Sequence, residues 1–374
     1  MNTKIKTYIS DSYEELIALL RTLCAIPAPS GKENARAEFI CDWLHKNGAK
    51  GAYIDEAKNV VLELNCEGSK SLRIFCAHTD TVFPDTSPFA VREDEENLYC
   101  PGVGDDTASV CVLMMVIRFF IEQNIVPDNG ILFVLNSCEE GLGNLKGTRH
   151  IFEKYARRTE CFISFDALIG KIYDKCVGSH RYRVEVFTEG GHSFQEFGKE
   201  NAISHLSSVV TKIYETQVPK RGNSRTTYNV GEIIGGTSVN TIAQSASMLC
   251  EYRSDDSQCL ETMKKEFEDI FSQAQKEGVE VKTQTIGIRP CTKGVDEEKQ
   301  ALLAKVCGTI VEEVIGESVA FKSGSTDCNI PLSMGIPAVC VGVFSGGGAH
   351  TREEWVKKES LKTGLEIALR ITLS

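Results

Sequence analysis

A histidine and an aspartate, His78 and Asp80, directly follow an apolar run at residues 72–77. Such a run predicts a buried strand. Alternate residues of an extended segment point the same way, so the imidazole and the carboxylate can be presented together. A carboxylate behind a histidine fixes its tautomer and raises its basicity toward a metal ion. By itself the triplet is a weak signal, and its meaning depends on the residues downstream of it.

Four further clusters of potential ligands occur downstream, each in a glycine-rich turn or after an apolar run. They are Gly102-Val-Gly-Asp-Asp-Thr107, Cys138-Glu-Glu-Gly141, Phe165-Asp166 and Gly346-Gly-Gly-Ala-His-Thr351. Imidazole and carboxylate ligands suit zinc, manganese, cobalt or a similar divalent ion. Five ligands exceed the needs of one tetrahedral zinc and suit two ions that share a carboxylate, about 3.5–4 Å apart. Each cluster alone could be a helix cap or a solvated loop, but five in this order favour a metal site.

The order and residue types of these clusters resemble the motifs of the co-catalytic zinc exopeptidases and amidohydrolases. That family includes carboxypeptidase G, peptidase T, aminoacylase and succinyl-diaminopimelate desuccinylase, and the resemblance extends over essentially the whole chain. The matching segments are H-T-D at 78–80, G-D-D at 104–106, E-E-G at 139–141, S-F-D at 164–166, G-x-H at 348–350, G-G-H-S at 190–193, S-V-N-T-I at 238–242 and Y-R at 252–253.

The resemblance implies two divalent metal ions per subunit, zinc before cobalt or manganese. Asp105 would bridge both ions. His78 and Asp166 would complete one site, and Glu140 and His350 would complete the other. In this family the peptide bond after the bridging aspartate is often cis.

The resemblance also implies roles for residues that are not metal ligands. Glu139 would be the general base that takes a proton from the water between the metals, and Asp80 would be the partner of His78. His192, Asn240 and Arg253 would bind the substrate carboxylate or the oxyanion from a lid domain. The histidine often reaches into the cleft of a partner subunit, so a homodimer is expected.

The ligand Asp166 indicates which branch of the family the chain resembles. Carboxypeptidase G-like members have Glu where this chain has Asp166, whereas peptidase T-like members use Asp. This favours hydrolysis of a peptide bond in short peptides, as in an aminopeptidase or a di/tripeptidase. An N-acyl-amino-acid deacylase is the first alternative, and a non-enzymatic dimerising sensor on the same fold is the second.

Composition limits the class of protein. The net charge is −11 with no basic block, which argues against nucleic acid or an anionic membrane as a partner. The fifteen cysteines are scattered without a C-x-x-C pair and predict free thiols in a reducing cytoplasm. The N-terminus lacks the apolar core of a signal peptide, and the longest apolar stretch, residues 110–120, is too short to span a membrane.

The elements that position these residues follow from periodicity and cap signals. Strands are expected at 60–64, 72–77, 131–136, 161–165 and 338–343. Helices are expected from Ser10-Asp11 to 23, from Ser30 to 47, and at 107–123, 144–155, 297–315 and 359–372. Alternating strands and helices predict an α/β domain with a mostly parallel sheet, whose ligands lie at the carboxyl ends of its strands.

From residue 179 the pattern changes to strand–helix–strand–strand–helix–strand, which predicts a ferredoxin-like α+β insertion. The expected catalytic domain is residues 1–178 and 291–374, and residues 179–290 form the lid and dimerisation domain. Asp327, in Ser323-Gly-Ser-Thr-Asp327, could steer substrate or cap its own loop.

Overall fold

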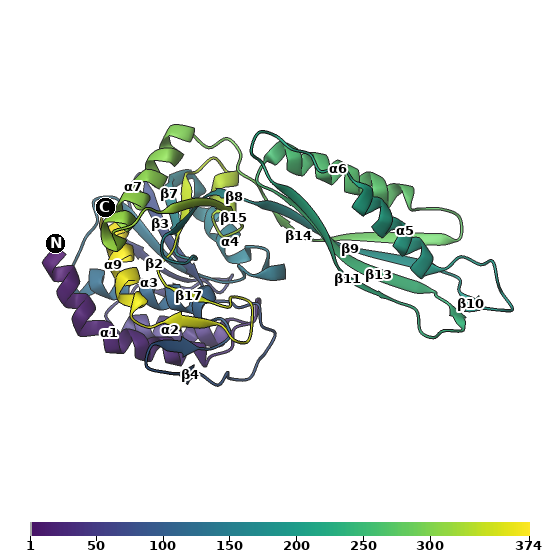
Figure 1. The fold of residues 1–374 in the computed structure, drawn as a ribbon. Helices are drawn as coiled ribbons and strands as arrows, with labels where there is room; N and C mark the ends of the chain where they lie inside the picture. Colours follow the sequence, from purple (N-terminus) through teal and green to yellow (C-terminus); the bar gives the residue numbers. More distant parts are fainter. Residues whose placement is uncertain (1) are drawn as a thin grey trace. The chain divides into compact units, whose positions relative to one another are not determined.

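The structure is a computed structural model that describes residues 2–374. The chain divides into two compact units. Residues up to Cys176 and Lys293–Ser374 form the first, and Val177–Thr292 form the second. The expected division lay at 178/179 and 290/291. Figure 1 shows the second unit as the teal and green part of the chain, inserted between two segments of the first.

The first unit is built on an eight-stranded mixed sheet. Its strands, in sheet order, are β1 (Tyr53–Ile54), β2 (Val60–Leu64), β6 (Gly130–Asn136), β3 (Leu72–His78), β7 (Thr159–Ser164), β16 (Ala338–Val341), β8 (Lys171–Cys176) and β15 (Ala320–Gly324). The four central strands, β6 to β16, are parallel to one another. The mostly parallel sheet predicted from the sequence is therefore confirmed.

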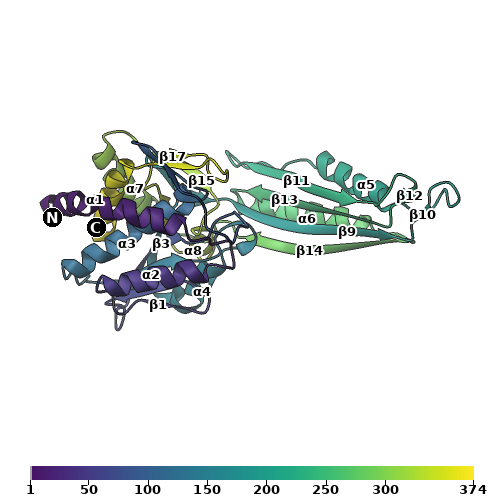
Figure 2. The same cartoon turned by 90° about the horizontal axis from the view of Figure 1, so that it is seen from below.

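Helices cover both faces of this sheet (Figure 1, Figure 2). One apolar core lies under the helices α1 (Asn2–Cys24), α2 (Asn34–Lys46), α3 (Ser109–Glu122), α7 (Glu297–Ile315) and α9 (Ser360–Leu373). The other face carries α4 (Lys146–Tyr155) and the short α8 (Asn329–Ser333). α3 is buried on nearly all sides because α1 and α9 pack on it from outside the sheet. None of the described helices is long and apolar enough to cross a membrane.

Two predicted helix starts are wrong. α1 already begins at Asn2, because Ile5, Tyr8 and Ile9 pack in the core and extend the helix before Ser10. α2 begins at Asn34 rather than after Ser30, whose hydroxyl donates instead to the Asp80 carboxylate. In both cases a tertiary contact overrides the local cap signal.

A small antiparallel sheet joins distant parts of the chain and was not expected from the sequence. Its strands, in order, are β17 (Gly346–Gly347), β18 (Trp355–Lys357), β5 (Asn97–Tyr99) and β4 (Arg92–Glu93). Pairing of β18 with β5 brings the loop that contains His350 beside the loop that contains Asp105.

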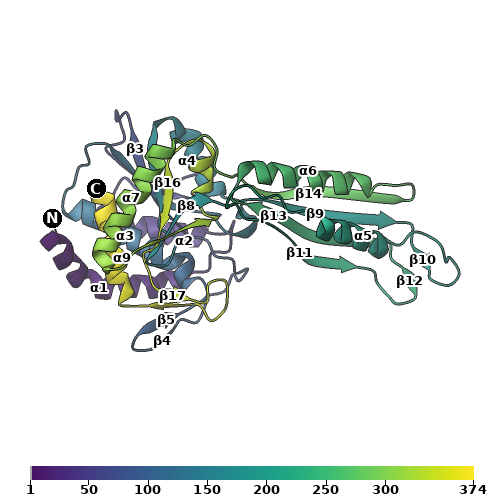
Figure 3. The same cartoon turned by 45° about the horizontal axis from the view of Figure 1, so that its top comes forward.

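The second unit is an antiparallel sheet with two helices on one face (Figure 3). Along the chain it comprises β9 (Gly178–Thr188), α5 (Ala202–Glu215), β11 (Thr226–Gly235), β13 (Ser245–Ser254), α6 (Ser257–Gln273) and β14 (Val279–Arg289). The sheet order β11-β13-β9-β14 is that of the ferredoxin-like fold, as predicted. β10 (Gly191–His192), which follows β9, pairs with β12 (Thr241–Ile242), which precedes β13, in a separate two-stranded antiparallel ribbon.

Candidate dimetal active site

The carboxyl ends of neighbouring parallel strands carry the first candidate ligands. His78 is the last residue of β3, and Asp166 follows β7 by two residues. Glu139 and Glu140 follow β6, whose last residue, Asn136, pairs with His78 in the β3–β6 register. Side chains that follow adjacent parallel strands meet at one edge of the sheet, which explains how segments far apart in sequence converge here.

Asp105 lies between the two candidate histidine ligands. Its Oδ1 is 3.0 Å from His78 Nε2, and its Oδ2 is 3.0 Å from His350 Nε2. The peptide bond between Asp105 and Asp106 is cis, as the resemblance implied. Asp105 is thus the residue that can reach two ions at once.

The remaining candidate ligands complete two overlapping groups. Asp166 Oδ1 lies 3.9 Å from His78 Nε2, and Glu140 Oε1 lies 3.2 Å from His350 Nε2. In each group one ligand atom per residue lies within 4.8 Å of the others. The groups are His78 with Asp105 and Asp166, and Asp105 with Glu140 and His350. A third group of the same compactness is His78 with Glu139 and Glu140. All five candidate ligands therefore converge, with Asp105 shared.

The electrostatics of this cluster fit cations. Burial raises the pKa of Glu140 to about 7, and the neighbouring Asp105 charge contributes to that rise. Burial and the Asp105 charge also raise the pKa of Asp166 well above its usual range. Among the described residues, the ion-pair partners of Asp105, Asp166 and Glu140 are His78 and His350 alone. This excess of buried carboxylate over positive charge suits two divalent ions.

The sequence pattern of Peptidase family M20/M25/M40 matches residues 74–374, which include every one of these residues. The chain belongs to this family. It is 24% identical over 370 residues to the succinyl-diaminopimelate desuccinylase of Corynebacterium glutamicum, covering 96% of each chain.

Two solved structures illustrate the same fold. A tripeptidase from Staphylococcus aureus superposes with a TM-score of 0.76 at 22% identity, covering 97% of this chain and 99% of that one. The Bacillus subtilis YXEP protein, described as a dinuclear metal-binding M20 peptidase, superposes with a TM-score of 0.64 at 15% identity, covering 97% of this chain and 98% of that one.

Asp80 contacts both the histidine and the glutamates of the M20 site. Its backbone carbonyl lies 3.1 Å from His78 Nδ1, and its carboxylate lies 3.5 Å from the same atom. With Nδ1 donating to the carbonyl, Nε2 is the ring nitrogen that could bind a metal ion. The Asp80 carboxylate also accepts the Ser30 hydroxyl at 2.5 Å and the N–H groups of Glu139 and Glu140, each at 2.9 Å. Ser30 is a supporting residue that sequence reasoning took for a helix cap.

Asp327 is completely buried rather than directed at solvent. Its carboxylate accepts hydrogen bonds from Asn136 Nδ2 at 2.7 Å and from the Thr148 hydroxyl. These contacts favour neither of the expected roles. Asp327 instead supports the end of β6, from which the chain continues to Glu139.

Glu354 is the most extensively bonded site residue that sequence reasoning missed. Its carboxylate accepts three backbone N–H groups of the loop that carries Asp105. Burial raises its pKa to about 7, against the lowering effect of these three donors. The sequence around Glu354 holds no signal for this role, because the loop that carries Asp105 lies some 250 residues earlier in the chain.

The lid residues occupy two different ends of the second unit. His192 pairs with Thr241 in the β10–β12 ribbon, which brings it beside Asn240. His192 is exposed, and its Nδ1 accepts the N–H groups of Phe194 and Gln195 at 3.3 and 3.4 Å, so its proton lies on Nε2. This Nε2–H can donate to a substrate oxygen.

Arg253 lies at the opposite end of the lid sheet. In the β9–β13 register Arg253 pairs with Ser179, whereas the pair nearest the β10–β12 ribbon is Ser245 and Phe187. Eight residues of strand separate these pairs, which corresponds to about 26 Å. The structure therefore brings His192 and Asn240 together but does not bring Arg253 to them. The Arg253 guanidinium is held by Glu251 at 2.7 and 3.0 Å.

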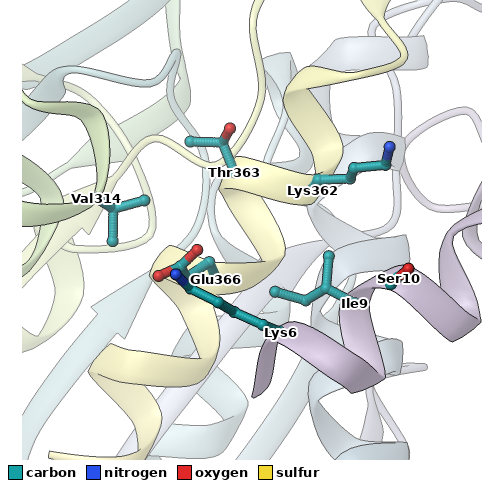
Figure 4. A pocket seen from close by; sticks show the side chains of 7 residues that line it. All are labelled: Lys6, Ile9, Ser10, Val314, Lys362, Thr363 and Glu366. Atoms are coloured by element: carbon teal, nitrogen blue, oxygen red, sulfur yellow. The ribbon is translucent and has the colours of Figure 1, made fainter. Parts of the chain in front are cut away.

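A surface hollow elsewhere in the first unit does not compete with this site. Figure 4 shows it between α1, α7 and α9, with Lys6, Lys362 and Glu366 among the side chains that line it. It is lined by no histidine and by none of the five candidate metal ligands.

Proposed function

We propose that this protein is a dinuclear metal-dependent hydrolase that cleaves a peptide bond in short peptides. The observation that carries the proposal is Asp105, whose two carboxylate oxygens lie 3.0 Å from His78 and His350 in two overlapping ligand groups. His78, Asp105 and Asp166 would hold one ion, and Asp105, Glu140 and His350 the other. Zinc suits this mixture of imidazole and carboxylate, with cobalt or manganese as alternatives.

Two divalent ions bound here would lower the pKa of the attacking water and polarise the substrate carbonyl. The protein supplies the proton transfers. Glu139 is buried, and one of its carboxylate oxygens lies within 4.8 Å of a ligand atom of His78 and one of Glu140. We assign it to neither ion, which leaves its carboxylate to act as the general base. It accepts a proton from the attacking water and returns it to the leaving amine. Asp80 fixes its position by accepting its backbone N–H.

The lid residues would bind the substrate. His192 presents its Nε2–H, which suits donation to the oxygen of the tetrahedral intermediate. Asn240 lies beside it, and Arg253 suits a free substrate carboxylate. Because Arg253 and the β10–β12 ribbon that carries His192 lie at opposite ends of one lid sheet, one short peptide cannot contact both within a single lid. This supports a homodimer in which His192 and Asn240 act on the cleft of the partner subunit.

The surface of the lid supports the same homodimer. β11 is an edge strand, and its Ile233 and Ile234 are more than half exposed. Ile203 of α5, the helix that packs beside β11, is also exposed. An apolar edge of this kind is suited to pairing with a second copy.

We also propose that the protein is located in the cytoplasm. All fifteen cysteines are free, and all but Cys161 are buried, as expected for thiols in a reducing compartment.

The second candidate function is deacylation of an N-acyl amino acid, which the similarity to a desuccinylase favours. The two functions are separated by assaying the metal-loaded protein on di- and tripeptides with a free amino terminus, and on N-acetyl and N-succinyl amino acids. A kcat/KM at least tenfold higher for the peptides supports peptidase function. The reverse order would assign the deacylase, and inactivity toward every compound would contradict both.

A further inference from the structure

The Glu354 carboxylate is bound entirely by the loop that carries Asp105. Its Oε2 accepts the N–H of Gly102 at 2.7 Å, and its Oε1 accepts the N–H groups of Gly104 and Asp105 at 3.0 and 2.8 Å. The side chain is almost fully buried, at 2% exposure. Three amide donors on one buried carboxylate form a rigid arrangement, because charged hydrogen bonds are shorter and stronger than neutral ones.

The glycines of this loop make the close approach of Glu354 possible. A Cβ at Gly104 would lie 2.9 Å from Glu354 Oε1 and 2.7 Å from the ring of Phe344. Gly102 has a φ of +74°, a left-handed conformation that glycine adopts without strain. The sequence of the loop is therefore adapted to the carboxylate that it surrounds.

Glu354 also belongs to the chain segment of the other histidine ligand. It follows His350 by four residues and immediately precedes β18, which pairs with β5. Its backbone carbonyl accepts the N–H of Cys100 at 3.1 Å, so side chain and main chain both bind the segment that leads to Asp105. The residue links the two loops whose ligands, Asp105 Oδ2 and His350 Nε2, meet at 3.0 Å.

We propose that Glu354 is a positioning residue of the metal centre. It fixes the Asp105 loop relative to the His350 loop and thereby sets the affinity of the ion site formed by Asp105, Glu140 and His350. The site formed by His78, Asp105 and Asp166 depends on it less, since His78 and Asp166 are held by β3 and β7. This inference rests on the proposed dinuclear function.

The test compares metal binding by three proteins: wild type, Glu354→Gln and the control Glu353→Gln. Glutamine keeps the size of Glu354 but replaces one acceptor oxygen by a donor amide, which opposes an N–H group of the loop. Glu353 is the adjacent residue, but its side chain is 77% exposed and pairs with Arg92 at the surface. Zn²⁺ and Mn²⁺ are titrated into metal-free protein without substrate, circular dichroism monitors the fold, and electron paramagnetic resonance of the Mn²⁺ forms monitors coupling between the ions.

Wild type and Glu353→Gln are expected to bind two coupled Mn²⁺ ions. Glu354→Gln should keep its fold and its first ion but bind the second at least ~10-fold more weakly, with the coupling signal lost, the effect typical of residues that orient metal ligands. Glu354→Ala should also bind the second ion more weakly. It provides the test if Glu354→Gln does not fold.

Equal affinity for both ions in Glu354→Gln and wild type would overturn the inference and leave the proposed function intact. Parallel weakening of both ions with a lower melting temperature would also overturn it, because it would assign Glu354 a general structural role. A wild type that binds fewer than two ions would remove the proposed dinuclear function itself and the inference with it.

Discussion

The Asp80 carboxylate accepts the backbone N–H of Glu139 at 2.9 Å. Its other oxygen accepts the N–H of Glu140, also at 2.9 Å, and the Ser30 hydroxyl. Asp80 thus fixes the main chain of the proposed base Glu139 and of Glu140, a proposed metal ligand, in addition to contacting His78. One residue connects the geometry of proton transfer to the geometry of metal binding.

Asp80→Asn should lower both metal affinity and turnover, each by about 10–100-fold, because an amide cannot accept at both of its ends. Isothermal titration with Zn²⁺ and steady-state kinetics measure the two effects. Ser30→Ala, which removes only the hydroxyl donor, should be milder in both. An Asp80→Asn protein with wild-type metal affinity would show that the peptide N–H contacts do not position Glu140.

Glu139→Gln should abolish turnover while leaving metal content nearly unchanged, since the substitution keeps size but removes the basic oxygen. We expect kcat to fall by at least ~10²-fold, the usual contribution of a general base. Glu140→Gln is the matched comparison and should instead lose metal. Near wild-type kcat in Glu139→Gln would place the base elsewhere.

Two divalent ions per subunit are expected at saturation, and their removal should destabilise the protein. The cluster of Asp105, Asp166 and Glu140 has only histidines as ion-pair partners among the described residues, so the ion-free form holds carboxylates in mutual repulsion. Ions at 100-fold above their Kd stabilise a folded protein by about 2.7 kcal/mol per site. Metal analysis and thermal melts before and after chelation, with zinc re-addition as the control, measure this. Saturation at one ion contradicts the dinuclear centre.

Mixing inactive His192→Ala subunits with inactive Glu139→Gln subunits should restore part of the activity. In a mixed dimer, one cleft would combine an intact Glu139 with an intact His192 from the partner subunit. Either variant alone, treated identically, is the control. If heterodimers form and no activity returns, His192 acts within its own chain or not at all.

The Glu93 side chain should contribute a pH-dependent part of the stability. Its carboxylate accepts Arg21 at 2.6 and 2.8 Å and Lys358 at 2.8 Å, and these bonds lower its pKa to about 2. A lowered folded-state pKa means that the contribution is fully present above the unfolded pKa, about 4.3, and is lost as the pH falls toward about 2.

Urea unfolding of Glu93→Gln and wild type measures this contribution. The difference should be about 0.2–1 kcal/mol at pH 7, since the cluster is near the surface, and should shrink below about pH 4. The exposed neighbour Glu95 provides the control, Glu95→Gln. A difference that is independent of pH would show that the ion pairs do not cause it.

The sequence was sufficient to predict those elements and site residues whose signal lies in a short stretch of neighbouring residues. Long periodic segments predicted the helix at 297–315 and the strand at 60–64 with the bounds that the structure has. The candidate ligands were recognised because each lies in a short cluster beside a strand end or in a glycine-rich turn. By contrast, strands of two or three residues such as β17 and β18 are too short to show periodicity.

Residues that act through distant contacts could not be predicted. Glu354 and Ser30 are ordinary polar residues in sequence, and only the fold brings them to Asp105 and Asp80. The separation of Arg253 from His192 likewise depends on strand register, which a single sequence does not specify.

The order of strands in the main sheet has a consequence for biosynthesis. β16, made after the whole inserted unit, lies between β7 and β8, both of which are made before it. A nascent chain that has reached residue 292 therefore has β7 and β8 without the strand that joins them, and it also lacks His350. The second unit is continuous and can form its own core by then. The second unit can therefore fold before residue 350 has been made, whereas the five candidate ligands can converge only after His350 has been synthesised.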